Sequence, residues 1–543
     1  MIPSRQIEPT FIPDDVQKFF DEYVGEVRAE KIIRRIWNRD HTIWRPDPTE
    51  IENRLGWLDL TETMPLALPE VRERVARLLA EGPLDVVLLG MGGSSLCPEV
   101  FRRTIGSKEG HPALHVLDTT VPEWVRRVTE EIDPAKTLFL VASKSGGTIE
   151  VMSAFKHFWD LASGLVEDPG SRFVAITDPG TGLAKMAEEH GFAETFLNPP
   201  DIGGRYSALS LFGLVPALLL GLDVEEMLSR AAVMAEACRS DIVDDNPGAS
   251  LGLFLAASTA VGRDKLTLVI DPIYESLGLW IEQLIAESTG KEGKGILPIA
   301  LEPLEYVAHY GYGRAFVVIA PSGKSSLPGR LDAMKAADYP VAVYRLKDPL
   351  DLGAEFFRWE FATALASHFL DIQPFDQPNV QEAKTLTGQV LAEFKGKGKL
   401  PEAPAGGSLQ DLLSKAQSTD YLAILAYLAE SPELEQALSD LRRTVMKRHR
   451  LATTVGYGPR YLHSTGQYHK GGPNTGLFLQ LVQDYSAYPI PGEPYGFESL
   501  AAAQALGDFQ ALSAKGRRVV QLRLGSSPAE EIRALAEQVA GGR

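Results

Sequence analysis

Two segments rich in serine and glycine follow apolar, strand-like runs, and their residue types suit anion binding. They are Leu84 to Leu96 (LDVVLLGMGGSSL) and Thr137 to Glu150 (TLFLVASKSGGTIE). In each, a run of branched aliphatic residues breaks into glycine and serine and then continues with helical spacing, so backbone amides and hydroxyls converge at a helix N-terminus. Two such turns in one doubly wound unit predict a phosphorylated small molecule held across the carboxyl ends of a parallel sheet.

A dinucleotide-binding fold is the alternative interpretation of the first segment. Gly90, Gly92 and Ser95 approximate G-x-G-x-x-G, and Asp118 ends the next apolar run, where a ribose-binding acid would lie. However, the third glycine is missing, and the second segment has no role in dinucleotide binding. Residues 143–148 instead supply three hydroxyls and an ammonium group, which suit a phosphate monoester on a sugar. The remaining alternative is that both segments are ordinary polar turns.

Strand-like runs alternate with helical stretches along most of the chain, which is typical of an α/β protein. The runs are 85–89, 114–117, 137–142, 173–176, 202–207, 266–270, 296–299, 315–320, 341–344, 421–427, 451–462, 477–482 and 519–524. We expect a helical segment at 1–60, α/β units at 61–240 and 241–400, and an α/β extension at 409–543. The sequence leaves open whether the extension is a third lobe or completes the second sheet.

Several local patterns refine this division. Trp37, Trp44 and Trp57 are expected to anchor the N-terminal segment to a larger body. The apolar run 208–222 is too short to span a bilayer and predicts a buried helix. The stretch 395–408, rich in glycine, proline and lysine, predicts a linker.

Composition excludes several classes of protein. The net charge of -18 argues against nucleic acid and anionic membranes as partners. Cys97 and Cys238 are the two cysteines, so the sequence has no disulfide framework, and neither has metal-ligand spacing. This cysteine usage favours a reducing cytoplasm. The N-terminus lacks a basic region followed by an apolar one, so we expect no signal peptide. We expect neither a metal nor a cofactor.

Five motifs resemble the glucose-6-phosphate isomerase family in order and spacing. They are GMGGSSL, SKSGGTIE, IGGRYSALS (202–210), WIEQLIAESTGK (280–291) and FDQPNVQEAK (375–384). Residues 40–60 and 461–481 are similar to the isomerase half of bifunctional transaldolase/glucose-6-phosphate isomerase proteins. The resemblance implies two flavodoxin-like sugar-isomerase (SIS) domains, a homodimer and reversible isomerisation of glucose 6-phosphate and fructose 6-phosphate, with a transaldolase partner or fusion in relatives. Alternatives are a dual phosphoglucose/phosphomannose isomerase and a non-catalytic sugar-phosphate regulator.

Moving a proton between C2 and C1 through a cis-enediol requires a carboxylate base and a cation at the developing enediolate. Glu287 follows an apolar run with helical spacing, and Gln283, one turn earlier, shares its face. The family position of Glu287 indicates the base. Arg205 follows two glycines, so a fixed cation can approach the ligand, and its family counterpart stabilises the intermediate.

The resemblance also implies the residues that bind the substrate and open its ring. The substrate-binding candidates are Gly93, Ser94, Ser143, Lys144, Ser145, Thr148, Gly204, Gln283 and Gln377. Lys384 matches a family lysine near the ring oxygen. The chain lacks the family's N-G-Q-H segment, whose histidine helps to open the ring from the neighbouring subunit. His469 and His463 in HSTGQYHK are the replacements we consider, His469 slightly ahead, with His309 as a third candidate and a polar structural turn as the alternative.

Overall fold

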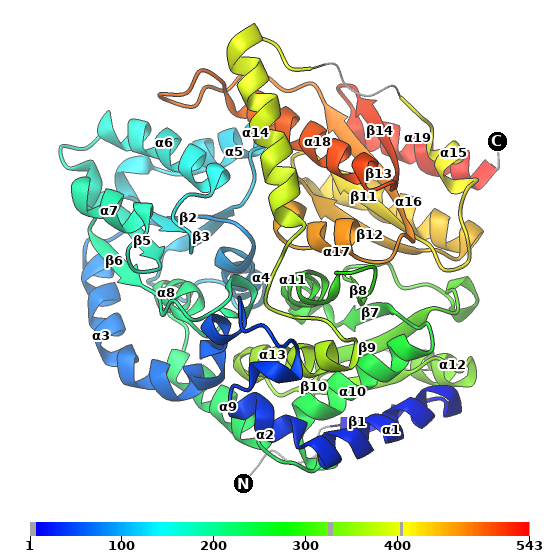
Figure 1. Ribbon diagram of the computed structural model, residues 1–543. Coiled ribbons are helices and arrows are strands. Elements are labelled where there is room, and N and C mark those ends of the chain that lie inside the picture. Colours follow the sequence, from blue (N-terminus) through cyan, green and yellow to red (C-terminus); the bar gives the residue numbers. More distant parts are fainter. Residues whose placement is uncertain (1–6, 324–328, 402–405, 542–543) are drawn as a thin grey trace.

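The computed structural model describes residues 7–323, 329–401 and 406–541, and its strands form three sheets (Figure 1). The first sheet is parallel, with strand order β3-β2-β4-β5-β6. Its strands are β2 (Asp85–Gly90), β3 (Ala113–Leu117), β4 (Thr137–Ala142), β5 (Phe173–Thr177) and β6 (Glu194–Leu197). Helices α4 (Leu96–Thr104), α5 (Pro122–Glu131), α6 (Ile149–Ser163) and α7 (Gly182–Glu189) connect them. Strands β4 and β5 are buried throughout, as expected where helices cover a parallel sheet on both faces.

The second sheet has the order β1-β10-β9-β7-β8. Its strands are β1 (Ile7–Phe11), β7 (Lys265–Ile270), β8 (Leu297–Ile299), β9 (Arg314–Pro321) and β10 (Val341–Leu346). Helices α10 (Pro247–Ala260), α11 (Leu277–Thr289), α12 (Arg330–Ala336) and α13 (Leu352–Phe369) accompany them. The N-terminal segment is therefore not purely helical, because β1 pairs antiparallel with the edge strand β10 before α1 (Asp14–Glu30) and α2 (Ile32–Trp37) begin.

The C-terminal strands form a third parallel sheet of their own, with order β12-β11-β13-β14, and do not complete the second sheet. They are β11 (Tyr421–Ala426), β12 (Ala452–Tyr457), β13 (Gly476–Gln483) and β14 (Arg518–Leu524). Their helices are α15 (Leu409–Leu413), α16 (Pro432–His449), α17 (Gly466–Gly471), α18 (Phe497–Ala514) and α19 (Pro528–Gly541). The predicted α/β class is confirmed.

The remaining helices join these parts: α3 (Leu60–Ala80), α8 (Leu211–Leu219), α9 (Val224–Ala237) and α14 (Val380–Lys397). Helix α8 is buried along its whole length, as the apolar run predicted. The prediction of a strand at 202–207 is wrong. Ile202 makes one isolated bridge to Leu55, and a 3-10 turn, η7 (Gly204–Tyr206), follows. Helix α14 occupies the start of the predicted linker, of which residues 402–405 lie outside the described part.

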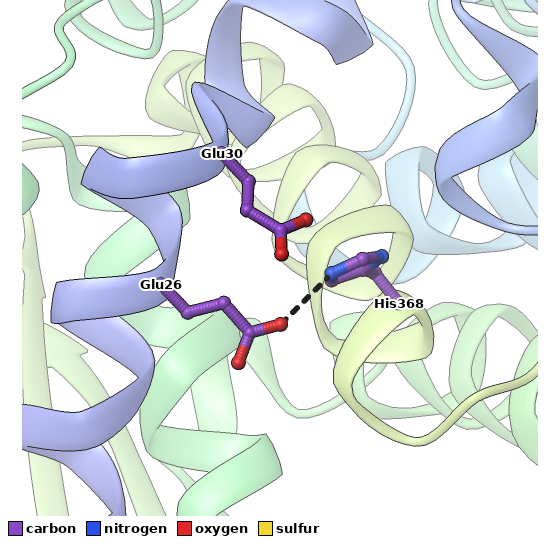
Figure 2. A group of neighbouring side chains, drawn as sticks. All are labelled: Glu26, Glu30 and His368. Atoms are coloured by element: carbon purple, nitrogen blue, oxygen red, sulfur yellow. Dashed lines mark ion pairs between the residues drawn. The ribbon is translucent and has the colours of Figure 1, made fainter.

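The N-terminal helices pack on α13 and its surroundings. Trp57 is buried, the indole of Trp44 donates to the carbonyl of Ala364 at 2.8 Å, and that of Trp37 donates to the carbonyl of Cys238 at 2.9 Å. Figure 2 shows Glu26 of α1 beside His368 of α13, an ion pair of 3.6 Å, with Glu30 next to it. We interpret this surface group, the one arrangement with metal-ligand spacing among the described residues, as a fastening of α1 to α13.

Helix α11 lies where the three sheets and their helices meet (Figure 1). It packs against α4 of the first sheet, α13 of the second and α17 of the third. Every residue of α11 except Leu279 is buried. A polar side chain on α11 is therefore surrounded by helices that belong to all three sheets. Of the helices described, none is long and apolar enough to cross a membrane.

Candidate active site

The second serine-rich turn, residues 143–148, lies between β4 and α6. The hydroxyls of Ser143 and Thr148 are 3.1 Å apart, and the amide of Gly146 donates to Ser143 Oγ at 3.2 Å. Gly146 has φ +70°, and a Cβ there would lie 2.8 Å from Thr181, so the tight turn requires glycine. Hydroxyls and free amides gathered at the N-terminus of the 15-residue helix α6 form a seat for an anion. Lys144 pairs with Asp178 and donates to the carbonyl of Pro200.

The first turn contains the 3-10 turn η4 (Gly92–Ser94) and lies directly against η7. A Cβ on Gly93 would come within 2.0 Å of the Gly204 carbonyl oxygen, so only glycine permits this close approach. Ser94 is buried beside it. The contact brings the first turn next to Arg205.

Asp118 does not serve as a free ribose-binding acid. Arg460 donates to both of its carboxylate oxygens at 2.8 Å, and Ser95 Oγ donates to it at 3.2 Å. All three side chains are buried or nearly so. The carboxylate is thus satisfied inside the protein, and the dinucleotide interpretation loses its second element.

Glu287 lies near the C-terminal end of α11 and is 5 % exposed. Gln283 Nε2 donates to Glu287 Oε2 at 3.2 Å, and Arg205 Nη1 lies 3.7 Å from the same oxygen. Burial raises the pKa of Glu287 above 4.5, while Arg205, His463 and Lys291 act to lower it. A buried carboxylate with a raised pKa is suited to accept a proton from carbon.

Arg205 is held rigidly. Its Nε donates to Ser288 Oγ at 2.8 Å, and its Nη2 donates to the carbonyls of Pro374 and Asp376 at 2.5 and 2.9 Å. Nη1, the nitrogen nearest to Glu287, also donates to Gln377 Oε1 at 3.3 Å. A guanidinium fixed on this side keeps one edge directed at the space in front of Glu287.

His463 reaches the same region from the C-terminal part of the chain. It ends the 3-10 turn η12 (Arg460–His463), and its carbonyl accepts a hydrogen bond from Gln283 at 2.9 Å. Its Nε2 lies 3.0 Å from Glu150 Oε1, which also accepts from Gln504 at 2.7 Å. Burial acts to raise the pKa of Glu150, but His463 and Lys384 hold it below its ordinary value. Glu150 is therefore an ionised partner for the imidazole.

The structure places the other two candidate histidines in different surroundings. His469 is buried against the third sheet, where Tyr421 Oη lies 3.0 Å from its Nδ1 and the Phe478 ring centroid lies 5.1 Å away. Burial lowers the pKa of His469 well below 6.5. His309 forms an ion pair with Glu305 at 2.9 Å. Of the three, His463 is the one that contacts the surroundings of Glu287.

Gln377 and Lys384 are both exposed. Gln377 contacts Arg205, and the charge of Lys384 lowers the pKa of Glu150. Lys384 lies on α14, which Figure 1 shows between the first and third sheets.

Sequence reasoning missed two residues within motifs that it quoted. Glu150 is the last residue of SKSGGTIE, and Lys291 is the last of WIEQLIAESTGK. An acid in the first turn of a helix and a lysine after a helix are ordinary, so neither stood out.

Glu282 is a second buried glutamate on α11. Burial raises its pKa to about 8, while Arg442 and Arg460 oppose this. Glu282 thus faces a different set of charges from Glu287.

A buried carboxylate, a fixed guanidinium and a histidine–carboxylate pair beside serine-rich turns are the groups that the isomerisation of a sugar phosphate requires. Comparison with known proteins agrees. The family model described as phosphoglucose isomerase matches residues 81–295, which include both serine-rich turns, Arg205 and Glu287. The glucose-6-phosphate isomerase of Carboxydothermus hydrogenoformans is 30% identical over 405 residues, 63% of this chain and 85% of that protein. The chain belongs to the glucose-6-phosphate isomerase family.

Other relatives extend the comparison. The glucose-6-phosphate isomerase of Rubrobacter xylanophilus is 28% identical over 396 residues, 62% of this chain and 89% of that protein. The solved structure of a hypothetical protein, TT0462, from Thermus thermophilus has a TM-score of 0.60 at 26% identity, covering 71% of this chain and 100% of that one. A glucose-6-phosphate isomerase structure from Chlamydia trachomatis has a TM-score of 0.59 at 20% identity, covering 69% and 86%, and shares the fold.

Proposed function

We propose that the site around Glu287 carries out the reversible isomerisation of glucose 6-phosphate and fructose 6-phosphate through a cis-enediol intermediate. The observation that carries this is the meeting of Glu287, Arg205 and His463 at one place from three distant segments. Family membership supports the same reaction. A coupled assay of fructose 6-phosphate conversion with the purified chain tests it. Absence of glucose 6-phosphate formation would contradict it.

In this proposal the serine-rich turns bind the phosphate. Ser143, Ser145 and Thr148 supply hydroxyls, and the amides at the start of α6 supply further donors. Lys144 adds a positive charge after leaving or sharing Asp178. Gly93, Ser94 and Gly204 bring the neighbouring backbone close enough to contact the same end of the substrate.

Glu287 acts as the base that removes the proton from C2 and returns it to C1. Arg205 lies on the same side and stabilises the charge that develops on the C1 and C2 oxygens. Gln283 orients the Glu287 carboxylate, and Gln377 stands where it can hydrogen-bond the sugar. Glu287 and Arg205 are held in place before the substrate arrives, so the side chains of the site need little reorganisation during the reaction.

His463 opens the sugar ring in this proposal, and it does so from the same chain as Glu287. The ionised Glu150 stabilises the imidazolium that forms when His463 takes a proton, and Lys384 lies near the ring oxygen. The pair has the geometry of a histidine oriented by a carboxylate. His469 instead has a structural role in the third sheet.

Removing hydroxyls from the phosphate seat should weaken binding of phosphorylated sugars. Ser145→Ala and Thr148→Val should each remove one hydrogen bond to an anion, worth about 1.5 to 3 kcal/mol. The loss should appear in KM and in inhibition by inorganic phosphate, with kcat changed less. Ser163→Ala, at an exposed position on the same helix α6, is the control. Unchanged phosphate inhibition in both loop variants would place the phosphate elsewhere.

We further propose that this protein is a cytoplasmic homodimer, and that in its relatives the isomerase associates with transaldolase or is fused to it. The buried free thiols of Cys97 and Cys238 support a reducing compartment. Sedimentation equilibrium measures the oligomeric state, and a monomer would contradict the dimer. Repeating the coupled assay with mannose 6-phosphate decides between a dedicated and a dual isomerase.

A further inference from the structure

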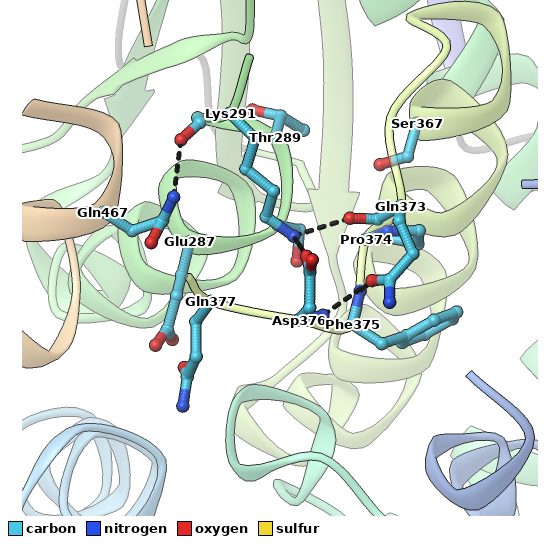
Figure 3. Close-up of polar contacts among 12 residues, drawn as sticks. Glu287, Thr289, Lys291, Ser367, Gln373, Pro374, Phe375, Asp376, Gln377 and Gln467 are labelled. Carbon is cyan, nitrogen blue, oxygen red and sulfur yellow. Dashed lines mark hydrogen bonds and ion pairs between the residues drawn. The ribbon is translucent and has the colours of Figure 1, made fainter. Parts of the chain in front are cut away.

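Lys291 is a buried cation whose charge acts on Glu287. It lies just beyond the end of α11 and is 2 % exposed. Its ammonium donates to the carbonyl of Gln373 at 2.6 Å and to Asp376 Oδ1 at 2.5 Å. Figure 3 shows this ammonium between the two groups, with Glu287 and Gln377 pointing in the same direction beside it.

The loop 373–377 that receives Lys291 is also the loop that holds Arg205. Its carbonyls at Pro374 and Asp376 accept from the guanidinium. Inside the loop, Gln373 Oε1 accepts from the amides of Phe375 and Asp376 at 2.7 and 2.6 Å, which fixes its turn. The same short loop thus binds two buried cations, and the charge of each lowers the pKa of Glu287.

The far end of this loop is fastened to the same helix. Gln467 of α17 donates to the carbonyl of Gly290 and to Asn379 Oδ1, each at 2.9 Å, and accepts from the Asn379 amide. Residues 373 to 379 are therefore tied to the end of α11 at both ends. Movement of the loop would displace Arg205 and Gln377 together.

An ammonium is a costly group to bury at this place. Burial lowers the pKa of Lys291 to about 7; Arg205 adds to this effect, while Asp376 and Glu287 oppose it. These are the charged groups that face the lysine, from η7, the loop and α11. An apolar side chain would fill the space at smaller cost in desolvation. The desolvation cost of the Lys291 ammonium therefore points to a role for its charge.

We propose that Lys291 is a positioning residue: by clamping Gln373 and Asp376 it fixes the loop that holds Arg205 and Gln377 over Glu287. The inference rests on the proposed roles of Glu287 and Arg205. Lys291 itself does not touch the substrate. Its effect is transmitted through the loop and through its charge, which favours the ionised form of Glu287.

The test compares Lys291→Met, Lys291→Arg and the control Lys294→Met. Lys294 lies three positions further on and forms an exposed ion pair with Asp371, so its loss should leave kcat unchanged. Lys291→Met should lower kcat by about 10²-fold, as expected when catalytic groups shift by about 1 Å. Inorganic phosphate should inhibit as before, while a sugar-acid phosphate that mimics the enediolate should bind more weakly. Lys291→Arg should recover part of the activity.

The pH profile separates positioning from mere packing. Loss of the Lys291 cation removes one of the groups that lower the pKa of Glu287, so the acid limb of kcat should move to higher pH in Lys291→Met. Lys291→Arg keeps the positive charge, so its kcat should fall at the same acidic pH as that of the unmodified protein. If Lys291→Met does not fold, Asp376→Asn keeps the lysine, weakens the clamp and should lower kcat with phosphate inhibition unchanged.

Two results would overturn this inference. One is a kcat of Lys291→Met or Asp376→Asn equal to that of the unmodified protein. The other is a parallel loss of phosphate inhibition, which would indicate general disruption. Neither result tests whether Glu287 is the base. If Glu287 were not the base, Glu287→Gln would remain active, while the Lys291 variants would still differ from the Lys294→Met control.

Discussion

Replacing Glu287 by glutamine should lower isomerisation by about 10²- to 10⁴-fold or more, the range for loss of a general base. The amide is nearly isosteric and still fits between Gln283 and Arg205, so the substrate should still bind. The loss should therefore appear in kcat, measured in the coupled assay at saturating fructose 6-phosphate.

Glu282 provides a matched control for this change. It is a second buried glutamate on α11 with a raised pKa, but the charges near it are Arg442 and Arg460. Glu282→Gln should keep kcat close to that of the unmodified protein. Equal losses in both variants would mean that buried charge on α11, and not the base, limits activity.

Replacing His463 by alanine should slow turnover of the cyclic sugar far more than reaction of the open-chain form. The His463 imidazole lies 3.0 Å from the Glu150 carboxylate, so it can pass the ring proton while that carboxylate orients it, whereas C2 chemistry belongs to Glu287. A loss of about 10²-fold or more on the cyclic substrate is expected for a general acid–base residue. The measurement compares net isomerisation of glucose 6-phosphate with C2 hydrogen exchange on a locked open-chain analogue.

His469→Ala is the companion variant, and it should act on stability. Its imidazole packs against Tyr421 and Phe478, so its removal leaves a cavity in the third sheet and should lower Tm. Its folded fraction should retain turnover of the cyclic sugar. If both alanine variants keep full activity, the segment is structural, and a water held by Lys384 becomes the better candidate for ring opening.

Local motifs allowed prediction of the residues whose roles depend on their neighbours in sequence. The serine-rich turns follow strand-like runs, so spacing indicated them, whereas Gly93 and Glu287 were assigned from the family resemblance. The close approach of Gly93 to Gly204, by contrast, joins two segments far apart in the sequence and became visible in the structure. The α/β class followed from the same alternation of runs.

Residues that act across distant segments could not be placed in this way. His463 and His469 share one motif, yet one meets Glu150 and the other Tyr421, because His463 ends η12 whereas His469 lies on α17. The strand β1 was missed because it is stabilised by pairing with β10, far along the chain. Lys291 gains its significance from the loop at 373–377, which a sequence pattern does not connect to it.

Hydrogen exchange at C2 in deuterated solvent tests the central claim, that Glu287 is the base, most directly. The unmodified protein and Glu282→Gln should incorporate deuterium from solvent at C2 of glucose 6-phosphate, since a proton held on a carboxylate can exchange before it returns. Glu287→Gln should bind the sugar phosphate without incorporating deuterium. Exchange by Glu287→Gln at the rate of the unmodified protein would contradict the account.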